Sequence, residues 1–303
     1  MTEEILVDKK QRRMAFFISF AATFLLMAAL GAGVAIWMGP MTRNPGASSG
    51  PPGMAYLPTE EDNLAMLVVG YDASGKAPPT FALVGFYPAE GRIPVAVLPG
   101  ETLVRGKTKT DTLAGTFRVG GARYTKLALE ESLGLTLDRY VAVELESFIS
   151  LVNLLGSTDF KLPMTLDAKL NGRDIKLSEG TQKLDGRKMA DIFIYPAYTG
   201  GEPARCVMAA DLISSVINFH LPLTQTKAAD ALFKSAVNAV ETDISQPDYQ
   251  QRKEAAAFMN RLEVRPAMTI ALTGRYNAAG NTYVLDEATE KALAAAFPPP
   301  GAS

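Results

Sequence analysis

The chain has 303 residues, of which 48% are hydrophobic, and its formal net charge is -2. This length fits one large domain or two small ones, and neither the charge nor any motif indicates a nucleic-acid partner. The single cysteine, Cys206, excludes an intrachain disulfide framework and a CxxC metal site. The single histidine, His220, argues against a zinc site or a Ser-His pair, and its apolar neighbours predict a half-buried, hydrogen-bonded side chain.

The first predicted element is a membrane helix over Met14–Met38, a run without any charged residue. The run is long enough to span a bilayer. Two lysines and two arginines directly precede it, so the positive-inside rule assigns residues 1–13 to the cytoplasm as a tail. A cleaved signal peptide is the alternative, but the run exceeds a usual h-region of about 7–15 residues and no A-x-A site follows. The rest of the chain is therefore expected to be extracytoplasmic.

Three further segments follow the predicted membrane helix. Residues 39–58 are rich in proline, glycine and serine, which predicts a semi-flexible linker. Residues 59–297 show no internal repeat and no shift in composition, which favours one domain. We expect a layered α/β structure with a central sheet covered by helices. Residues 298–303 are predicted to form a flexible tail.

Three apolar runs are predicted to form the centre of that sheet. They are Leu64–Gly70, Thr80–Tyr87 and Ile93–Leu98, and turn-rich residues separate them. Each has the length of a strand, and nearly continuous apolar sequence is typical of strands buried on both faces.

The remaining segments alternate between helical and extended patterns. The predicted helices are Thr112–Val119, Arg123–Leu133, Glu144–Leu155, Ala204–Phe219, Thr224–Thr242, Pro247–Leu262, and two that begin after Asp185 and Asp286. The predicted strands are Arg139–Val143, a hairpin in Phe160–Leu177 that turns at Asn171-Gly172, and a closing pair of Met268–Gly274 with Thr282–Leu285. Gly120-Gly121 is predicted to break the first two helices, Gly180 to form a turn, and Arg105–Asp111 to be a polar loop.

The order of these segments resembles the LytR-CpsA-Psr family over residues 63–219, and more weakly beyond them. NLAMLVVGYD, TFALVGFYP and IPVAVLPGETLV resemble the family's first three strands. TLAGTFRVGG resembles its helix that ends in a double glycine, and ESLGLTLDRYVAVELESFISLVNLLG resembles its helix-strand-helix unit. LSEGTQKLDGRKMADI resembles its Gly-x-x-x-Leu-x-Gly helix. Six such pieces in the correct order predict the family's fold.

The resemblance implies a particular chemistry. The family transfers glycopolymers from a polyprenyl pyrophosphate lipid to peptidoglycan, with arginines on the phosphates, acids on Mg²⁺ and the lipid tail in an apolar tunnel. The family-like site residues that remain as ligand-binding candidates are Asp72, Thr80, Glu101, Thr102 and Arg205. The sequence departs from the family at five positions, where Pro79 replaces an aspartate, Ala114 an asparagine, and Gly100, Ile194 and Pro196 arginines.

Two further sets of charged residues could either bind a ligand or be ordinary solvated surface residues. Asp72 and Glu101 could together hold Mg²⁺ if the family-like site functions, or be two surface acids at strand ends. The second grouping is a basic cluster, whose members are Arg105, Lys107, Lys109, Arg118, Arg123 and Lys126. It could form a relocated phosphate site to which Arg105 and Lys107 contribute, but a solvated loop and helix face is the favoured interpretation.

The lost arginines decide the predicted function. Each buried hydrogen bond to a charged group contributes about 1.5–3 kcal/mol, so three missing arginines remove most of the affinity for a pyrophosphate. We therefore predict a membrane-anchored cell-envelope protein that binds a polyprenyl-phosphate lipid, an anionic glycopolymer or an envelope protein without catalysis.

Two alternatives to this function stay open. One is a diverged phosphotransferase that attaches glycopolymers to peptidoglycan, and the other is a structural envelope protein without a ligand. A lipid-sized cavity with Arg105, Lys107 or Arg205 at its mouth would favour binding or transfer, and a filled core would favour the structural protein.

Overall fold

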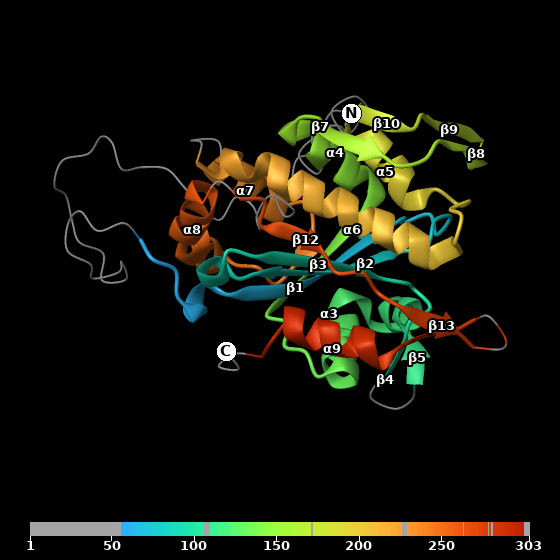
Figure 1. Ribbon diagram of the computed structural model, residues 1–303, viewed down its shortest axis with the longest axis horizontal. Coiled ribbons are helices and arrows are strands. Elements are labelled where there is room, and N and C mark those ends of the chain that lie inside the picture. The colour runs from blue at the N-terminus through green and yellow to red at the C-terminus, as the bar shows by residue number, and fades with distance from the viewer. Residues whose placement is uncertain are drawn as a thin grey trace, which may run out of the picture.

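The chain folds into three layers, a central sheet with helices on each face (Figure 1). This computed structural model describes residues 56–105, 110–170, 172–225, 229–262, 264–277, 279 and 281–299. The predicted cytoplasmic tail, the membrane helix and residues 39–55 of the predicted linker lie outside the described residues. The prediction of a layered α/β domain is confirmed.

The central sheet is mixed and has the strand order β11-β6-β1-β2-β3-β12. Its strands are β1 (Leu64–Tyr71), β2 (Thr80–Phe86), β3 (Ile93–Leu98), β6 (Arg139–Glu144), β11 (Glu241–Thr242) and β12 (Ala267–Thr269). The strands β1, β2 and β3 are antiparallel neighbours, whereas β6 joins β1 and β12 joins β3 in parallel. The three apolar runs of the sequence therefore form the centre of the sheet.

Both faces of the sheet are buried. On β1, Leu64, Met66 and Val68 belong to one core, and the intervening Ala65, Leu67 and Val69 belong to the other. This alternation follows from the pleat, which points successive side chains to opposite faces.

The first face is covered by five helices and two small hairpin-like sheets (Figure 1). The helices are α4 (Leu145–Leu155), α5 (Gly186–Ile194), α6 (Gly201–His220), α7 (Ala229–Val237) and α8 (Gln246–Arg261). The small sheets pair β7 (Thr158–Leu162) with β10 (Gly180–Leu184), and β8 (Leu166–Leu170) with β9 (Arg173–Leu177). By length and composition α6 could cross a membrane, yet its residues are mostly buried in this core.

The second face is covered by α3 and α9, seen below the sheet in Figure 1. The elements on this side are α3 (Leu113–Leu133), α9 (Glu287–Ala296), β4 (Leu103–Arg105), β5 (Thr110–Thr112), β13 (Gly274–Tyr276) and β14 (Tyr283–Leu285). The predicted break in α3 is confirmed, since Gly120 and Gly121 have non-helical torsions and Gly121 has a φ of 65°. The predicted cap of α9 is also confirmed, since Asp286 accepts a hydrogen bond from the Thr289 amide.

Three predicted elements are wrong in part. The predicted helix Thr224–Thr242 is instead a 3-10 turn, the short α7 and β11. Gly180, which was predicted to form a turn, is instead the first residue of β10. The predicted strand Met268–Gly274 is divided, because its first part extends the central sheet beside β3 and its last residue begins β13. In each case pairing with a distant strand overrides local propensity.

His220 is more buried than the sequence predicted. The residue is 3% exposed, and its Nε2 lies 2.9 Å from Thr158 Oγ1. Burial lowers the pKa of His220 to about 4. The histidine is hydrogen-bonded, as predicted, and this environment favours its neutral form.

His220 makes stability dependent on pH. Because its folded pKa lies below the ordinary value of 6.5, its contribution is present above pH 6.5 and is lost as the pH falls toward 4. We expect the wild-type chain to lose about 3 kcal/mol more unfolding free energy over this interval than His220→Gln, which does not titrate. Denaturant unfolding at several pH values measures this difference, and parallel profiles would contradict it.

Candidate functional site

The loop between β1 and β2 is organised by Asp72. One oxygen of its carboxylate accepts a hydrogen bond from the Ser74 amide, and the other accepts from Ser74 Oγ and the amides of Lys76 and Ala77. Partial burial opposes its ionisation, but these hydrogen bonds outweigh it and lower the pKa of Asp72. Asp72 therefore holds the shape of the loop that leads to Thr80.

Arg205 on α6 reaches the start of β2. Its Nη1 donates to Thr80 Oγ1 at 3.0 Å and to the carbonyl oxygen of Phe193 at 2.8 Å. Its Nε donates to Glu202 Oε2 at 2.7 Å, and its Nη2 donates to the other oxygen of the same carboxylate. The structure thus brings the predicted residues Thr80 and Arg205 together.

Glu202 neutralises Arg205 and was missed in the sequence. Burial of Arg205, which is 3% exposed, opposes its charge, but the hydrogen bonds and charge of Glu202 raise the pKa of the guanidinium above its ordinary value. The spacing of three residues on a helix was the available signal, because such residues lie on the same face. The pair is bidentate and well shielded from solvent, so Arg205 has little charge left for an external anion.

A polar cavity of about 280 Å³ opens beside this pair. Arg205, Glu202, Lys76 and Tyr195 are among the residues that line it. Its volume is near the lower end of the range of roughly 300–1,000 Å³ that is typical of small-molecule sites.

The polar cavity adjoins an apolar seam between the sheet and α4, α5 and α6. It shares Ile194 with an apolar cavity of about 50 Å³, which is lined by Gly70 and Ala82 of the sheet. That cavity shares Phe148 and Phe193 with a third cavity, of about 10 Å³. The apolar cavity has room for several water-sized groups, because one such group needs only about 10–15 Å³ of this space. In the part of the chain that the structure describes, the core is therefore not filled, and the cavities of this seam are smaller than a whole lipid.

The positions at which the sequence departs from its family pattern fall into two groups, of which the first brings Pro79, Gly100 and Ala114 together. A Cβ atom at Gly100 would lie 3.6 Å from the Cβ of Ala114 and 3.9 Å from the carbonyl oxygen of Pro79. The other two, Ile194 and Pro196, line the polar cavity. The frame of the site is thus assembled, but uncharged side chains occupy these five positions.

Glu101 and Thr102 form the corner that follows β3. The carbonyl oxygen of Glu101 accepts from the Tyr283 amide, and the Thr102 amide donates to the carbonyl oxygen of Pro99. Glu101 Oε2 and Thr102 Oγ1 are both buried without a hydrogen-bond partner among the described residues. Backbone pairing therefore fixes the corner, and its two side-chain oxygens are left for another group.

The two acids of the predicted magnesium pair differ in how far the protein already occupies them. The Asp72 carboxylate already accepts four hydrogen bonds from its own loop, which leaves Glu101 as the one candidate acid with an unoccupied oxygen. No group of three or more His, Cys, Asp or Glu side chains within the described part of the chain could hold a metal ion. Mg²⁺ is commonly bound by one or two carboxylates together with water and substrate phosphates, so the magnesium site stays a prediction.

Arg105 lies away from the polar cavity. It is exposed at the end of β4, which packs with α3 on the face opposite α6, and its amide donates to Ser132 Oγ. Lys107 and Lys109 lie outside the described residues. Of the other bases in the predicted cluster, Arg118 and Arg123 are exposed and Lys126 pairs with Glu130. This arrangement is that of a solvated surface.

Cys206 is a buried free thiol beside Arg205. Burial raises its pKa, and the nearby Glu202 and Glu101 raise it further against the opposing charge of Arg205. A thiol without thiolate character is a poor nucleophile, so Cys206 acts as an apolar core residue.

Comparisons with known proteins identify the fold. The model of the LytR_cpsA_psr family matches residues 52–296. A putative transcription regulator from Eubacterium siraeum superposes with a TM-score of 0.71 at 18% identity, covering 86% of this chain and 98% of the other. TagV from B. subtilis superposes with a TM-score of 0.63 at 20% identity, and the match covers 78% of this chain and 97% of TagV. TagT bound to LI-WTA superposes with a TM-score of 0.59 at 19% identity, and the match covers 78% of this chain and 91% of TagT. The search of curated proteins found no match.

Proposed function

Because the chain belongs to the LytR_cpsA_psr family, we propose that it binds a polyprenyl-phosphate lipid without transferring a group from it. The phosphate occupies the polar cavity beside Arg205, and the first isoprene units enter the apolar seam. The observation that carries this proposal is that the two lie side by side and share the lining residues Ala77, Pro78 and Ile194.

The charge of the polar cavity supports binding over catalysis. Transfer from a pyrophosphate requires cations that stabilise the developing charge. Here Arg205 is paired with Glu202, and Ile194 and Pro196 contribute no charge. Lys76 remains as a further base in the lining, which suits a monophosphate better than a reacting pyrophosphate.

We also propose that the protein is anchored in the membrane by Met14–Met38 with its domain outside the cytoplasm. The supporting observations are the uncharged run itself and the basic residues before it. An anchor at this position would keep the polar cavity within reach of lipids in the same membrane. TagT, a structure of the same fold, is bound to LI-WTA.

Filling the apolar seam tests the proposal. A Cβ atom at Gly70 has no neighbour closer than Thr80 Cβ, at 3.9 Å, so it fits without a clash, and Gly70 lines the apolar cavity that a longer side chain would enter. Gly70→Leu is expected to weaken binding of a polyprenyl monophosphate at least about tenfold by occupying the tail's path. It should also raise the unfolding free energy by about 0.5–1 kcal/mol, because glycine destabilises a strand. Binding is measured with the full chain in detergent.

Gly70→Ala is the matched control, because it adds a single carbon and leaves most of the cavity open. It should gain stability as Gly70→Leu does, yet keep its affinity for the lipid. Equal affinities of the wild-type chain, Gly70→Ala and Gly70→Leu would show that the lipid does not enter the seam.

A second candidate, a diverged glycopolymer phosphotransferase, is favoured by the unpartnered oxygen of Glu101. The two functions separate in one assay, in which the full chain is incubated with Mg²⁺ and a polyprenyl pyrophosphate-linked glycan. The binding function predicts no transfer or hydrolysis. Turnover that disappears in both Asp72→Ala and Glu101→Gln would establish the transferase instead.

A further inference from the structure

Lys76 gives the polar cavity its net charge. The charged side chains that line this cavity are Lys76, Glu202 and Arg205, and the last two are paired with each other. The ammonium group of Lys76, which is exposed, forms no hydrogen bond or ion pair with the residues that the structure describes. One uncompensated positive charge therefore remains in the lining, and it favours an anionic ligand.

The loop that carries Lys76 is constrained on both sides of this residue. Before it, Gly75 adopts a φ of 68°, and its amide donates to the carbonyl oxygen of Asp72 at 2.9 Å, which makes a tight turn. After it come Ala77, Pro78 and Pro79. Proline fixes its own φ and restricts the residue before it to extended conformations. The backbone of the loop therefore has little freedom around Lys76.

The carboxylate of Asp72 determines where the backbone of Lys76 lies. Its Oδ2 accepts hydrogen bonds from the amides of Lys76 at 3.1 Å and Ala77 at 3.2 Å. Its Oδ1 accepts from the Ser74 amide at 2.8 Å. Asp72 itself lines the apolar cavity and is not among the residues that line the polar cavity. Any effect of Asp72 on a ligand in the polar cavity is therefore expected to pass through the loop.

We propose that Lys76 is the residue that binds the lipid phosphate and that Asp72 is a positioning residue, which holds the Lys76 backbone beside the polar cavity. These roles rest on the proposed function, and they name the cation that recognises its phosphate. The ammonium group is a compact charge on a flexible stem, so a fixed backbone limits the space that it must search. Asp72 contributes through the amides of its own loop and holds no ligand.

The charge of Asp72 separates positioning from simple electrostatics. Asp72→Asn removes a negative charge close to an anion site, so electrostatics alone would strengthen phosphate binding. Asparagine also keeps only one acceptor oxygen and replaces the other with an NH₂ group, which cannot accept from the amides of Ser74, Lys76 and Ala77 together. A positioning role therefore predicts weaker binding, which is the opposite sign.

The test measures binding of farnesyl monophosphate and of farnesol, its neutral alcohol, to the full chain in a neutral detergent. Lys76→Gln should weaken binding of the phosphate at least about tenfold, because it removes a charge-assisted hydrogen bond. Asp72→Asn should weaken it at least about threefold, and the double variant should bind no more weakly than Lys76→Gln, because Asp72 acts through Lys76. Neither substitution should change the affinity for farnesol. Lys161→Gln, an exposed lysine on β7, is the matched control and should keep the phosphate affinity.

The outcomes separate these roles from the proposed function. Phosphate binding that is unchanged in Lys76→Gln would overturn the assignment of Lys76 and leave the proposed function standing. Equal or tighter binding by Asp72→Asn, additive losses in the double variant, or an equal loss of farnesol binding would overturn the positioning role. A wild-type chain that binds no farnesyl monophosphate would overturn both these roles and the proposed function.

Discussion

Replacing Arg252 with methionine is expected to lower the free energy of unfolding by about 3–5 kcal/mol. Arg252 is 6% exposed, and its guanidinium connects α8 to the segment before β1 through the carbonyl oxygens of Asp62 and Asn63. Methionine keeps most of the volume but leaves these two carbonyls without the donor. A buried acceptor without a donor costs about 1–3 kcal/mol.

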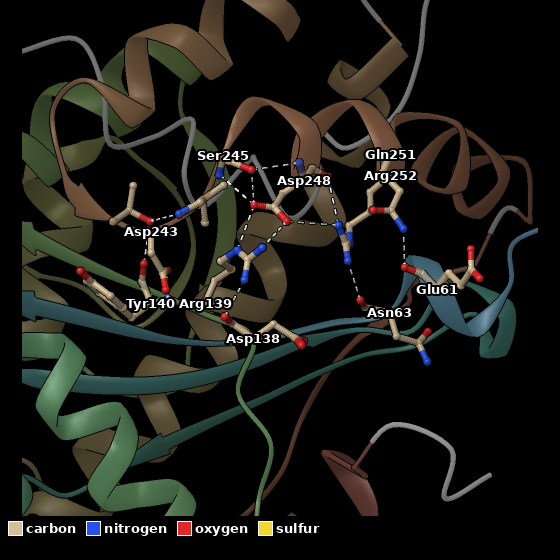
Figure 2. Close-up of polar contacts among 12 residues, drawn as sticks. Glu61, Asn63, Asp138, Arg139, Tyr140, Asp243, Ser245, Asp248, Gln251 and Arg252 are labelled. Carbon is tan, nitrogen blue, oxygen red and sulfur yellow. Dashed lines mark hydrogen bonds and ion pairs between the residues drawn. The ribbon is translucent and has the colours of Figure 1, made fainter. Parts of the chain in front are cut away.

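The neighbouring contacts explain why the loss is not easily compensated. Asp248 on the same helix forms a bidentate ion pair with Arg139 of β6, in which Nη2 and Nε of the arginine donate to the two carboxylate oxygens at 2.7 and 2.9 Å (Figure 2). Ser245, which caps the helix, also donates to the Asp248 carboxylate. Arg139 is therefore committed elsewhere and cannot replace Arg252. Asp62 is held from the other side by Tyr56, whose hydroxyl donates at 2.6 Å.

Arg261→Met on the exposed end of α8 is the matched control for Arg252→Met. Its guanidinium lies over the ring of Phe258 at the surface, and we expect a change within about 0.5 kcal/mol. Chemical denaturation of both variants measures the difference. Equal destabilisation would mean that the carbonyls of Asp62 and Asn63 find water in place of Arg252.

Glu202→Gln is expected to strengthen binding of a polyprenyl monophosphate at least about tenfold. In the wild-type chain Glu202 is an internal anion that competes with the ligand for Arg205. Glutamine keeps the size of the side chain and removes its charge. The guanidinium at the polar cavity then has its charge available for phosphate, and a hydrogen bond to a charged group contributes about 1.5–3 kcal/mol.

The control for Glu202→Gln is Glu146→Gln, which removes the acid of another glutamate–arginine pair. Its partner Arg187 is half exposed on α5, and this pair does not line the polar cavity. Phosphate affinity should not change in this variant. If Glu202→Gln instead weakens binding, Glu202 positions Arg205 for the phosphate and the wild-type pair is already the binding form.

The central strands and most helices could be predicted because their signals are local. The three apolar runs that form β1, β2 and β3 could be recognised as strands from their length, their apolar composition and the turns that bound them. The caps at Asp185 and Asp286 depend on side chains within three residues. Gly120-Gly121 breaks α3 for the same reason, since Gly121 adopts a φ of 65° by itself. The family resemblance rests on the order of these local pieces.

The content of the site could not be predicted in this way. Pro79, Gly100 and Ala114 are separated along the chain, and they become neighbours in space only when β2, β3 and α3 pack together. The sequence identified Arg205 as a retained base, and only the structure shows that Glu202 has already neutralised it. The sequence also cannot predict whether the core is filled or contains cavities, because the apolar residues alone do not show how they pack.

The sequence by itself therefore determined the order of elements, the double burial of the central strands and the positions where charged family residues are missing. Only the tertiary structure decided that Pro79, Gly100 and Ala114 meet, that Arg205 is paired with Glu202 and that an apolar seam adjoins the polar cavity. The physical reason is range. Strand and helix propensities and caps act over a few residues, whereas charge pairing and cavities depend on contacts between residues that are distant in the chain.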